Sequence, residues 1–289
     1  MKKHLIFGLL ILTTYAGISQ EKHNSIKNQS KETPEYTVVS ASDIKWGALN
    51  PARGKMGPRA ANLWGDRTQT GPSGILVKFN DGFSSPPHIH NVTYKAIVLS
   101  GNIHNDDPKA ENMWMPANSF WIQPKGEIHI TAAMGASNLA LVEIEEGPYL
   151  VKPESEKFDA GERPINVDPS NLVWVSTATI NWLNHTSTAD LNAYVAYLWG
   201  KPGVEGELGG IFLRLSPNTT SNIVVNASDF KAVVVKGEPT YSNPANTNSQ
   251  TLSLGSYVGS NQNTTHTFST QTEDVVLYIR ANGSFQLSN

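Results

Sequence analysis

The sequence predicts an all-β protein made of two copies of one small sandwich or barrel domain. After residue 36, short apolar runs alternate with Gly, Pro, Asn and Asp at spacings near ten residues, which is typical of such folds. No stretch keeps a period of 3.6 residues over three turns with capping residues at its ends. Four blocks of sequence also recur, in one order, at an almost constant offset.

The composition fits this fold and excludes several classes of function. At about 150 residues per domain, the 289 residues correspond to roughly two domains. The formal net charge is -3, so no summed positive field attracts a phosphate backbone, and we expect no nucleic-acid partner. Cysteine is absent, which excludes disulfides, thiolate metal sites, iron–sulfur clusters and cysteine nucleophiles.

The first residues are typical of a secretory signal peptide, predicted over residues 1–20. Lys2 and Lys3 precede the apolar run Leu5–Leu12, which is too short to span a membrane, and small residues follow it. A polar linker is predicted over residues 21–37. No later segment reaches ~18 consecutive apolar residues, so we expect an exported, periplasmic or extracellular protein with no membrane element after signal removal.

The predicted strands fall into two groups, one in each of two domains predicted at residues 38–152 and 165–289. Each strand is a short apolar run bounded by turn residues. The runs are Gly74–Phe79, Tyr94–Leu99, Ser119–Gln123, Ile128–Ala132, Leu139–Ile144, Tyr194–Trp199, Ile211–Leu215, Phe230–Val235 and Val275–Ile279.

The internal repeat relates these two groups of strands. Each block of the first half has a counterpart 135 to 137 residues later. The pairs are Leu63–Asp66 with Leu198–Lys201, Gly74–Phe79 with Gly210–Leu215, Tyr94–Gly101 with Phe230–Gly237, and Ser119–Phe120 with Ser256–Tyr257. The sequence therefore predicts one β-domain present twice.

Three histidines form a pattern that points to a metal ion. His88 and His90 are two residues apart, so on a strand they face the same side while Ile89 faces the other. His129 follows a turn that contains Pro and Gly, at the start of a predicted strand. Three neutral imidazoles suit Zn, Fe, Ni, Mn or Cu and leave coordination positions open. The alternative is a set of hydrogen-bonded core or surface histidines without a metal.

The residues around these histidines resemble the two motifs of the cupin family. Gly82, which five residues separate from His88–His90, and Gly101 match the first motif, and Pro124–His129 matches the second. The strand that contains Thr93–Lys95 is most similar to ChrR-like cupins of the DUF4437 type. The resemblance implies two tandem jelly-roll (cupin) β-barrel domains, and a cavity that holds one divalent transition metal (Fe, Zn, Ni or Mn).

The resemblance implies His88, His90 and His129 as metal ligands, with two departures from the family pattern. Tyr94 occupies the position of the usual Glu ligand, and Ala133 replaces the expected Asn. Tyr94 is therefore a candidate catalytic residue, as a weak fourth ligand, an acid or a hydrogen-bond donor to a bound water. It is equally well explained as a core tyrosine whose hydroxyl finds a partner.

The second copy lacks most of this pattern. By the repeat offset, His88 and His90 correspond to Val224 and Asn226, and Tyr94 corresponds to Phe230. Only His129 keeps a counterpart, His266. We therefore expect a degenerate site in the second domain, which would serve a structural role such as covering an edge or forming a dimer face.

Other polar residues are assigned to the surface. His104 lies in an Asn- and Asp-rich stretch that resembles a metal-binding cluster but is more simply explained as a turn, and Glu143, Glu145 and Glu146 are predicted to form a solvated strand face. No phosphate-binding glycine loop, serine-hydrolase elbow or zinc-protease helix motif is present.

These observations predict an exported metal-binding bicupin. One interpretation is a metal-dependent enzyme, dioxygenase-like or a related lyase or isomerase, on a small organic substrate. The alternative is a non-catalytic metal- or ligand-binding or sensor module. Whether the chain is an enzyme stays open at this point, as does assembly into a homodimer.

Overall fold

The computed structural model describes residues 36–185, 191–244, 246–261 and 263–289. The predicted signal peptide, residues 1–20, lies outside the described residues, as does the predicted linker up to residue 35. Helical structure in the described part consists of short 3-10 turns: η1 (Ala41–Asp43), η2 (Pro51–Met56), η3 (Glu154–Glu156), η4 (Pro169–Asn171) and η5 (Thr177–Thr179). No helix of the described part has the length and hydropathy needed to cross a bilayer.

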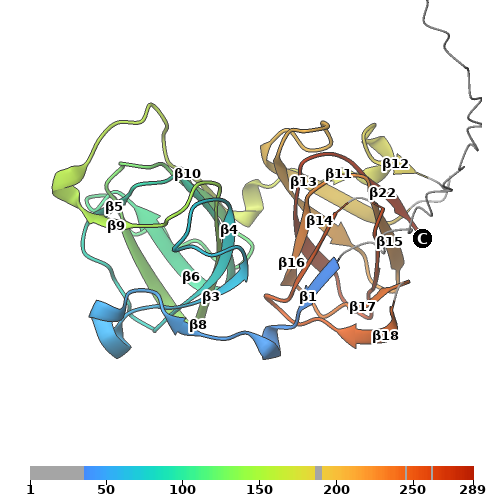
Figure 1. Cartoon of the computed structure of the whole chain (residues 1–289), viewed down its shortest axis with the longest axis horizontal. Coiled ribbons are helices and arrows are strands. Elements are labelled where there is room, and N and C mark those ends of the chain that lie inside the picture. Colours follow the sequence, from blue (N-terminus) through green and yellow to red (C-terminus); the bar gives the residue numbers. More distant parts are fainter. Residues whose placement is uncertain (1–35, 186–190, 245, 262) are drawn as a thin grey trace, which may run out of the picture. The chain divides into compact units, whose positions relative to one another are not determined.

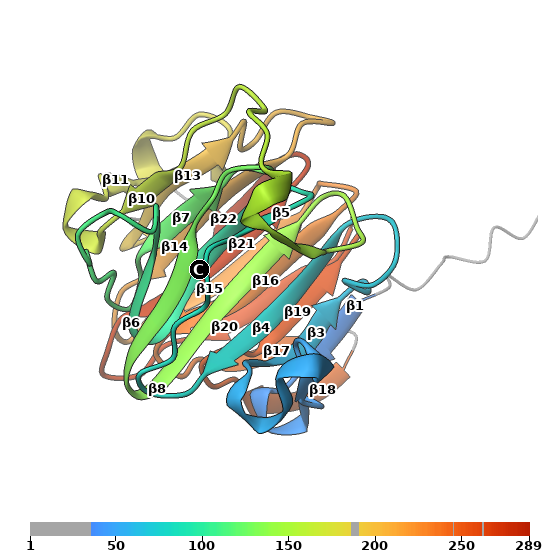
Figure 2. The ribbon, with the colours of Figure 1, turned by 90° about the vertical axis from the view of Figure 1, so that its left-hand side faces the viewer.

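The first half of the chain is built on a seven-stranded sheet (Figure 2). Its strands, in spatial order, are β10 (Ile165–Val167), β7 (Phe120–Gln123), β6 (Tyr94–Asp106), β8 (Ile130–Ile144), β4 (Ser73–Phe79), β3 (Arg59–Trp64) and β2 (Gly47–Ala48). A two-stranded sheet, β5 (His88–His90) with β9 (Val151–Pro153), lies over it. The long strands β6 and β8 pair along most of their lengths, and the register of this pairing shifts between Val98 and Asn102.

The second half repeats this architecture with a seven-stranded and a six-stranded sheet. The first contains β1 (Tyr36–Val39), β19 (Tyr257–Ser260), β16 (Phe230–Lys236), β21 (Val275–Ala281), β14 (Gly209–Leu215), β13 (Ala193–Gly200) and β11 (Val175–Ser176). The second contains β12 (Asn184–His185), β22 (Phe285–Ser288), β15 (Thr220–Val225), β20 (Thr265–Ser269), β17 (Thr240–Asn243) and β18 (Asn246–Thr251). The protein is thus all-β, with two tandem jelly-roll barrels, as predicted.

The two seven-stranded sheets have the same strand order, and each ends in a strand from the other half of the chain. β1 pairs antiparallel with β19, and β10 pairs antiparallel with β7 (Figure 2). β10 lies within the range expected for the second domain, yet it completes the sheet of the first barrel. The exchange joins the halves by backbone hydrogen bonds as well as by side-chain packing.

Three apolar clusters explain why the strands are so hydrophobic. One cluster fills the first barrel, a larger one fills the second, and a third includes residues from both seven-stranded sheets. Leu76 and Phe212, from β4 and β14, belong to the shared cluster, whereas their neighbours Ile75 and Leu213 face the barrel interiors. These strands are therefore buried on both faces, which produces continuous apolar runs instead of alternation.

All nine predicted strand runs lie in or overlap observed strands, but two local predictions were wrong. Residues 128–132 and 139–144 belong to one bent region of chain, because β8 runs continuously from Ile130 to Ile144. The predicted turn at His104 lies inside β6, where the imidazole is buried. Gly101, at a positive φ of 74°, permits the bend in β6, since a Cβ there would collide with Asn138.

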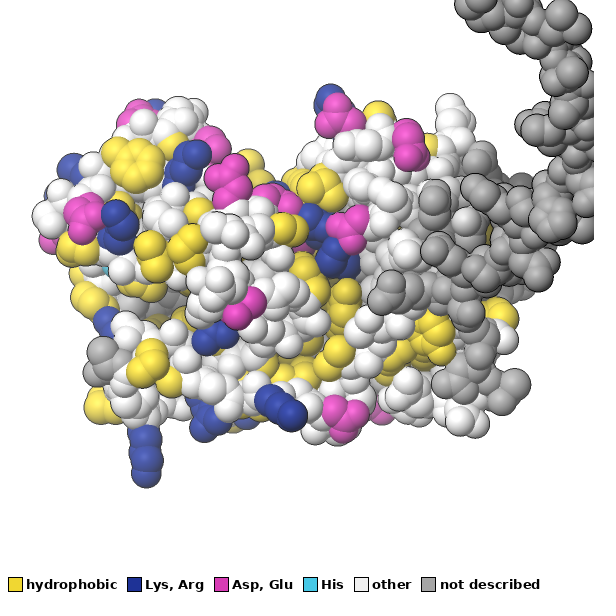
Figure 3. Space-filling view, viewed as in Figure 1, with side chains coloured by type: hydrophobic (Ala, Val, Ile, Leu, Met, Phe, Trp, Pro, Cys, Tyr) yellow, Lys and Arg dark blue, Asp and Glu magenta, His cyan; other side chains and the backbone are white. Residues whose placement is uncertain are grey.

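The predicted solvated face of Glu143, Glu145 and Glu146 was also wrong in part. Glu143 is only 2% exposed because the second barrel covers this face of β8. Glu145 forms an ion pair with Arg280 of β21 at 2.6 Å, and Glu146 is exposed. On the face drawn in Figure 3, basic and acidic side chains are otherwise interspersed, in keeping with the small net charge.

Candidate metal centre

Backbone hydrogen bonds bring the three predicted histidines together in the first barrel. His88 and His90 lie on β5, which pairs with β9. His129 precedes β8 and forms a bridge with His88, with N···O distances of 3.1 and 3.0 Å between their backbone amides and carbonyls. One ligand nitrogen from each ring lies within 4.8 Å of the others, so the three imidazoles converge as the sequence predicts.

The same nitrogen of each ring is held by a backbone carbonyl. Nδ1 of His88 lies 2.9 Å from the Pro86 oxygen, Nδ1 of His90 lies 3.1 Å from the Leu150 oxygen, and Nδ1 of His129 lies 3.1 Å from the Glu127 oxygen. A carbonyl can only accept, so each Nδ1 carries the proton and donates it. Each Nε2 therefore keeps its lone pair, and this second-layer arrangement is the one that orients histidine ligands in metal sites.

Burial keeps the three imidazoles neutral. Loss of solvation lowers the pKa of His129 to about 3, with the neighbouring His88 adding to the effect. Burial also lowers the pKa of His90 far below its ordinary value, and that of His88 to a lesser degree. The positive charge of Arg53 lowers the pKa of His88 further. Neutral imidazoles are the form that binds metal ions.

The three Nε2 atoms fit a metal ion. Nε2 of His129 is buried and has no hydrogen-bond partner among the described residues. A buried polar atom without a partner costs about 1–3 kcal/mol and calls for an explanation. Three neutral nitrogen donors with fixed tautomers are a suitable set for a divalent transition metal, which would satisfy this atom.

Tyr94 faces the barrel interior, as its position on the strand predicts, and its hydroxyl is engaged with a buried amide. The hydroxyl donates to Oδ1 of Asn105 at 2.9 Å, and Asn105 Nδ2 donates to Oε1 of Gln123 at 2.9 Å. Gln123 Nε2 then donates to the Glu127 oxygen at 3.4 Å, the same oxygen that holds His129. This network links Tyr94 to the orientation of His129. A role for Tyr94 as ligand or acid stays a prediction.

Tyr149 was missed by the sequence analysis. Its ring stacks on His90 with centroids 4.3 Å apart, and its hydroxyl lies 3.0 Å from Nε2 of His90. Because Nδ1 of His90 holds the proton, the Tyr149 hydroxyl is the donor. Tyr149 lies in the loop between β8 and β9, and no motif in the sequence marks it.

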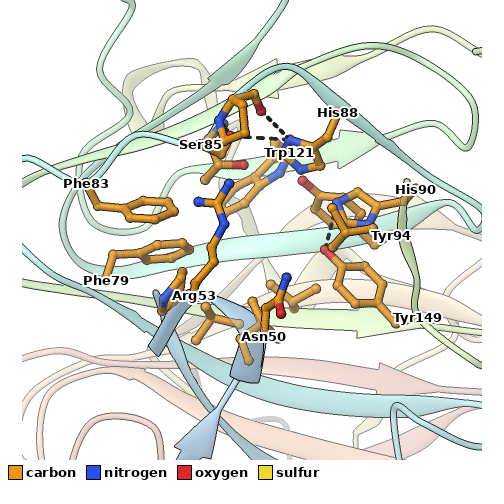
Figure 4. A pocket seen from close by; sticks show the side chains of 17 residues that line it. Asn50, Arg53, Phe79, Phe83, Ser85, His88, His90, Tyr94, Trp121 and Tyr149 are labelled. Atoms are coloured by element: carbon orange, nitrogen blue, oxygen red, sulfur yellow. Dashed lines mark hydrogen bonds between the residues drawn. The ribbon is translucent and has the colours of Figure 1, made fainter. Parts of the chain in front are cut away.

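A cavity of about 130 Å³ opens beside His88 and His90 (Figure 4). Its walls are mainly apolar and aromatic, and they include Phe79, Phe83 and Trp121. Arg53 from η2 also lines it, another residue that the sequence analysis missed. Cavities of this order accommodate a ligand the size of benzene.

The second barrel differs from the predicted correspondence by one residue. His88 pairs with His129, and in the second barrel it is Ile223 that pairs with His266. Ile223 and Val225 point into the core, so they replace His88 and His90, and the assignment to Val224 and Asn226 was wrong. The turn before β16 is one residue longer than the turn before β6, and a shift of one residue exchanges the two faces of a strand.

His266 has no free nitrogen for a metal ion. Its Nδ1 lies 2.9 Å from the Tyr241 hydroxyl, and its Nε2 lies 2.8 Å from the Ser260 hydroxyl. The ring stacks on Phe230, with centroids 5.4 Å apart, inside a filled apolar core. The one retained histidine of the second copy is a hydrogen-bonded core residue.

The comparison with protein families identifies the chain. A family model described as a domain of unknown function, DUF4437, matches residues 37–288. The chain belongs to this family. This DUF4437 match spans both barrels. No curated protein matches the sequence.

Solved structures similar to this DUF4437 protein have the cupin fold. A proposed dioxygenase from Nostoc punctiforme is 14% identical, with a TM-score of 0.63 over 87% of this chain and 84% of that one. Lactobacillus farciminis oxalate decarboxylase, solved with formate, is 11% identical, with a TM-score of 0.54 over 86% of each chain. Hazelnut (Corylus avellana) vicilin is 11% identical, with a TM-score of 0.52 over 85% of each chain. These likenesses establish a bicupin fold.

Proposed function

We propose that the first barrel binds one divalent transition metal on His88, His90 and His129 and acts as a metal-dependent enzyme on a small organic molecule. The observation that carries this proposal is the convergence of three neutral imidazoles, one with a buried and unpartnered nitrogen, beside an apolar cavity. The dioxygenase and decarboxylase descriptions of two cupin neighbours favour an oxygen-dependent or a lyase reaction.

Each group of residues has a distinct part in this reaction. A bound ion of Fe, Zn, Ni or Mn would supply Lewis acidity or, for a redox-active metal, chemistry with O2. The carbonyls of Pro86, Leu150 and Glu127 fix the imidazole tautomers. The aromatic walls exclude water from a bound molecule. The Tyr149 hydroxyl holds a proton beside His90, where it can donate to an oxygen of that molecule.

The metal assignment is tested by measuring metal content in purified protein. We expect about one equivalent per chain in the wild type and loss of at least tenfold in His129→Ala, because two imidazoles bind much more weakly than three. His266→Ala is the matched control, since it removes the equivalent histidine of the second barrel, and it should retain the metal. Equal metal content in both variants would contradict the assignment.

Catalysis is tested separately, because a metal site alone fits the alternative of a non-catalytic binding or sensor module. The metal-loaded protein is incubated with a panel of small organic molecules while O2 uptake and products are recorded. Turnover that disappears in His129→Ala supports an enzyme. Tight ligand binding without O2 uptake or product supports the binding module.

We also propose that the protein is exported, on the basis of Lys2, Lys3 and the apolar run Leu5–Leu12. Fractionation of the producing cells and sequencing of the mature N-terminus test this. A cytoplasmic protein that begins at Met1 would contradict it. Assembly into a homodimer stays a prediction, which light scattering of the purified protein checks.

A further inference from the structure

The side chains that line the cavity include a positive charge and no negative charge. Among the described residues that line the cavity, Arg53 carries the only formal charge, because His88 and His90 are neutral and neither Asp nor Glu occurs. The remaining walls are mostly hydrocarbon, so little polar surface offsets the charge of the guanidinium. A site of this kind favours a ligand with negative charge at one end.

Local packing holds Arg53 in this place. In η2 the Arg53 amide donates to the Asn50 oxygen at 3.1 Å. The stem of the arginine packs over Gly57, where an added Cβ would lie 2.8 Å from the Arg53 Cβ and 3.7 Å from its Cδ. Gly57 thus leaves room for the arginine stem, and Figure 4 shows the guanidinium on the side of the cavity near Ser85 and His88.

Arg53 differs from the arginines that serve structural roles. Arg163 is paired with Asp159 at 2.9 Å, and Arg280 is paired with Asp229 and Glu145 at 2.6 Å each. Arg53 forms no ion pair within the part of the chain that the structure describes. Its planar fork of N–H donors is therefore available, and this fork matches the two oxygens of a carboxylate.

We propose that the cavity binds a small apolar monocarboxylate, with the carboxylate on Arg53 and the hydrocarbon or aromatic body against Phe79 and Phe83. The carboxylate would then lie on the side of the cavity where His88 lies. This inference rests on the proposed function, because it names the substrate class of the same site. The cavity volume of about 130 Å³ limits the body of the ligand to about the size of a benzene ring.

The experiment compares benzoate with benzamide, which has nearly the same shape but no charge. Binding of each is measured by titration calorimetry to metal-free and metal-loaded wild type, Arg53→Ala and Lys55→Ala. Lys55 lies on the same exposed turn and does not line the cavity, so Lys55→Ala is the matched control for the loss of one positive charge.

We expect the wild type to prefer benzoate to benzamide by at least tenfold, and Arg53→Ala to lose that preference through a ten- to hundredfold weaker benzoate affinity. Lys55→Ala should bind like the wild type. Three results would overturn the inference: no benzoate binding to the wild type, equal affinity for both probes, or unchanged benzoate affinity in Arg53→Ala.

The test separates this inference from the metal assignment. Loss of benzoate binding in metal-free Arg53→Ala supports the carboxylate site even if the wild type proves to bind no metal. Conversely, benzoate binding that requires the metal and is unchanged in Arg53→Ala would place the carboxylate on the metal. That result would overturn the inference and leave the proposed function intact.

Discussion

The two barrels share one strand order, but the one histidine that they have in common has different hydrogen-bond partners in each. His129 of the first barrel has a buried Nε2 without a hydrogen-bond partner among the described residues, next to His88 and His90, which line an open cavity. His266 of the second barrel has partners on both nitrogens and an aromatic ring stacked against it. The same residue at the same place in the fold is thus poised to bind in one barrel and fully satisfied in the other.

The difference lies in the residues opposite this histidine. His88 and His90 leave three imidazoles around a space, whereas Ile223 and Val225 supply hydrocarbon that joins the core. Isoleucine and valine bury without any need for a partner, so at these two positions the second barrel is stabilised by packing. The first barrel keeps desolvated polar groups that a ligand would satisfy, which is typical of a functional site.

The largest expected effect comes from giving the first barrel the residues of the second. In His88→Ile/His90→Val the metal content should fall from about one equivalent to less than 0.1, because one imidazole cannot hold the ion. Elemental analysis of the purified protein checks this. The conservative exchange Ile223→Val/Val225→Ile in the second barrel should leave the metal content unchanged, and a loss there would mean that metal content merely reports folding.

The second prediction concerns the buried ion pairs of Arg280, which lies between the two barrels. Arg280 is buried between them and pairs with Glu145 and Asp229, so Arg280→Met should lower the free energy of unfolding by about 3 kcal/mol. Chemical denaturation followed by circular dichroism checks this. Arg163→Met, which breaks an exposed pair with Asp159, should have no measurable effect. Equal effects of the two variants would show that burial of the pair is unimportant.

The third prediction uses the histidine of the second barrel as a pH probe. Burial lowers the pKa of His266 to about 4, so the unfolded chain takes up this proton from about pH 6.5 downward while the folded chain does not. The contribution of His266 to stability is therefore complete above pH 6.5 and is lost as the pH falls toward 4.

Replacement of this group should reduce the acid sensitivity. In His266→Gln, the fall in unfolding free energy between pH 7 and pH 4.5 should be smaller by about 2–3 kcal/mol than in the wild type. Urea denaturation at both pH values measures it. An unchanged fall would mean that His266 titrates alike in the folded and the unfolded protein.

The smallest predicted effect compares two tyrosines that each bind a histidine. Tyr241→Phe removes the partner of His266 and should destabilise the protein by about 1 kcal/mol. Tyr149→Phe removes the partner of His90 and should have a similar effect on metal-free protein only, because the metal would satisfy that nitrogen. Thermal unfolding with and without metal checks both. A metal-independent effect in Tyr149→Phe would argue against His90 as a ligand.

Much of this architecture could be predicted because the signals are local. Turn residues, apolar runs and the repeat indicated an all-β protein with one domain present twice, and the resemblance to the cupin motifs implied the bicupin fold. The positions of His88, His90 and His129 on their predicted strands indicated their convergence. The offset of the repeat misled only where one extra residue in the turn before β16 shifted the register of the second copy. A repeat offset does not reveal a one-residue insertion in a turn, but strand pairing does.

The sequence by itself determined the number of domains, the positions of nine strands and the residues able to hold a metal, since these follow from periodicity, the repeat and short-range motifs. Only the tertiary structure showed that Arg53 and Tyr149 line the cavity and that the second barrel buries Glu143. It also showed that β1 completes the sheet of the second barrel and β10 that of the first. Each of these depends on contacts between residues far apart in the chain. Periodicity along the chain shows which face of a strand is buried, but not which distant segment covers it.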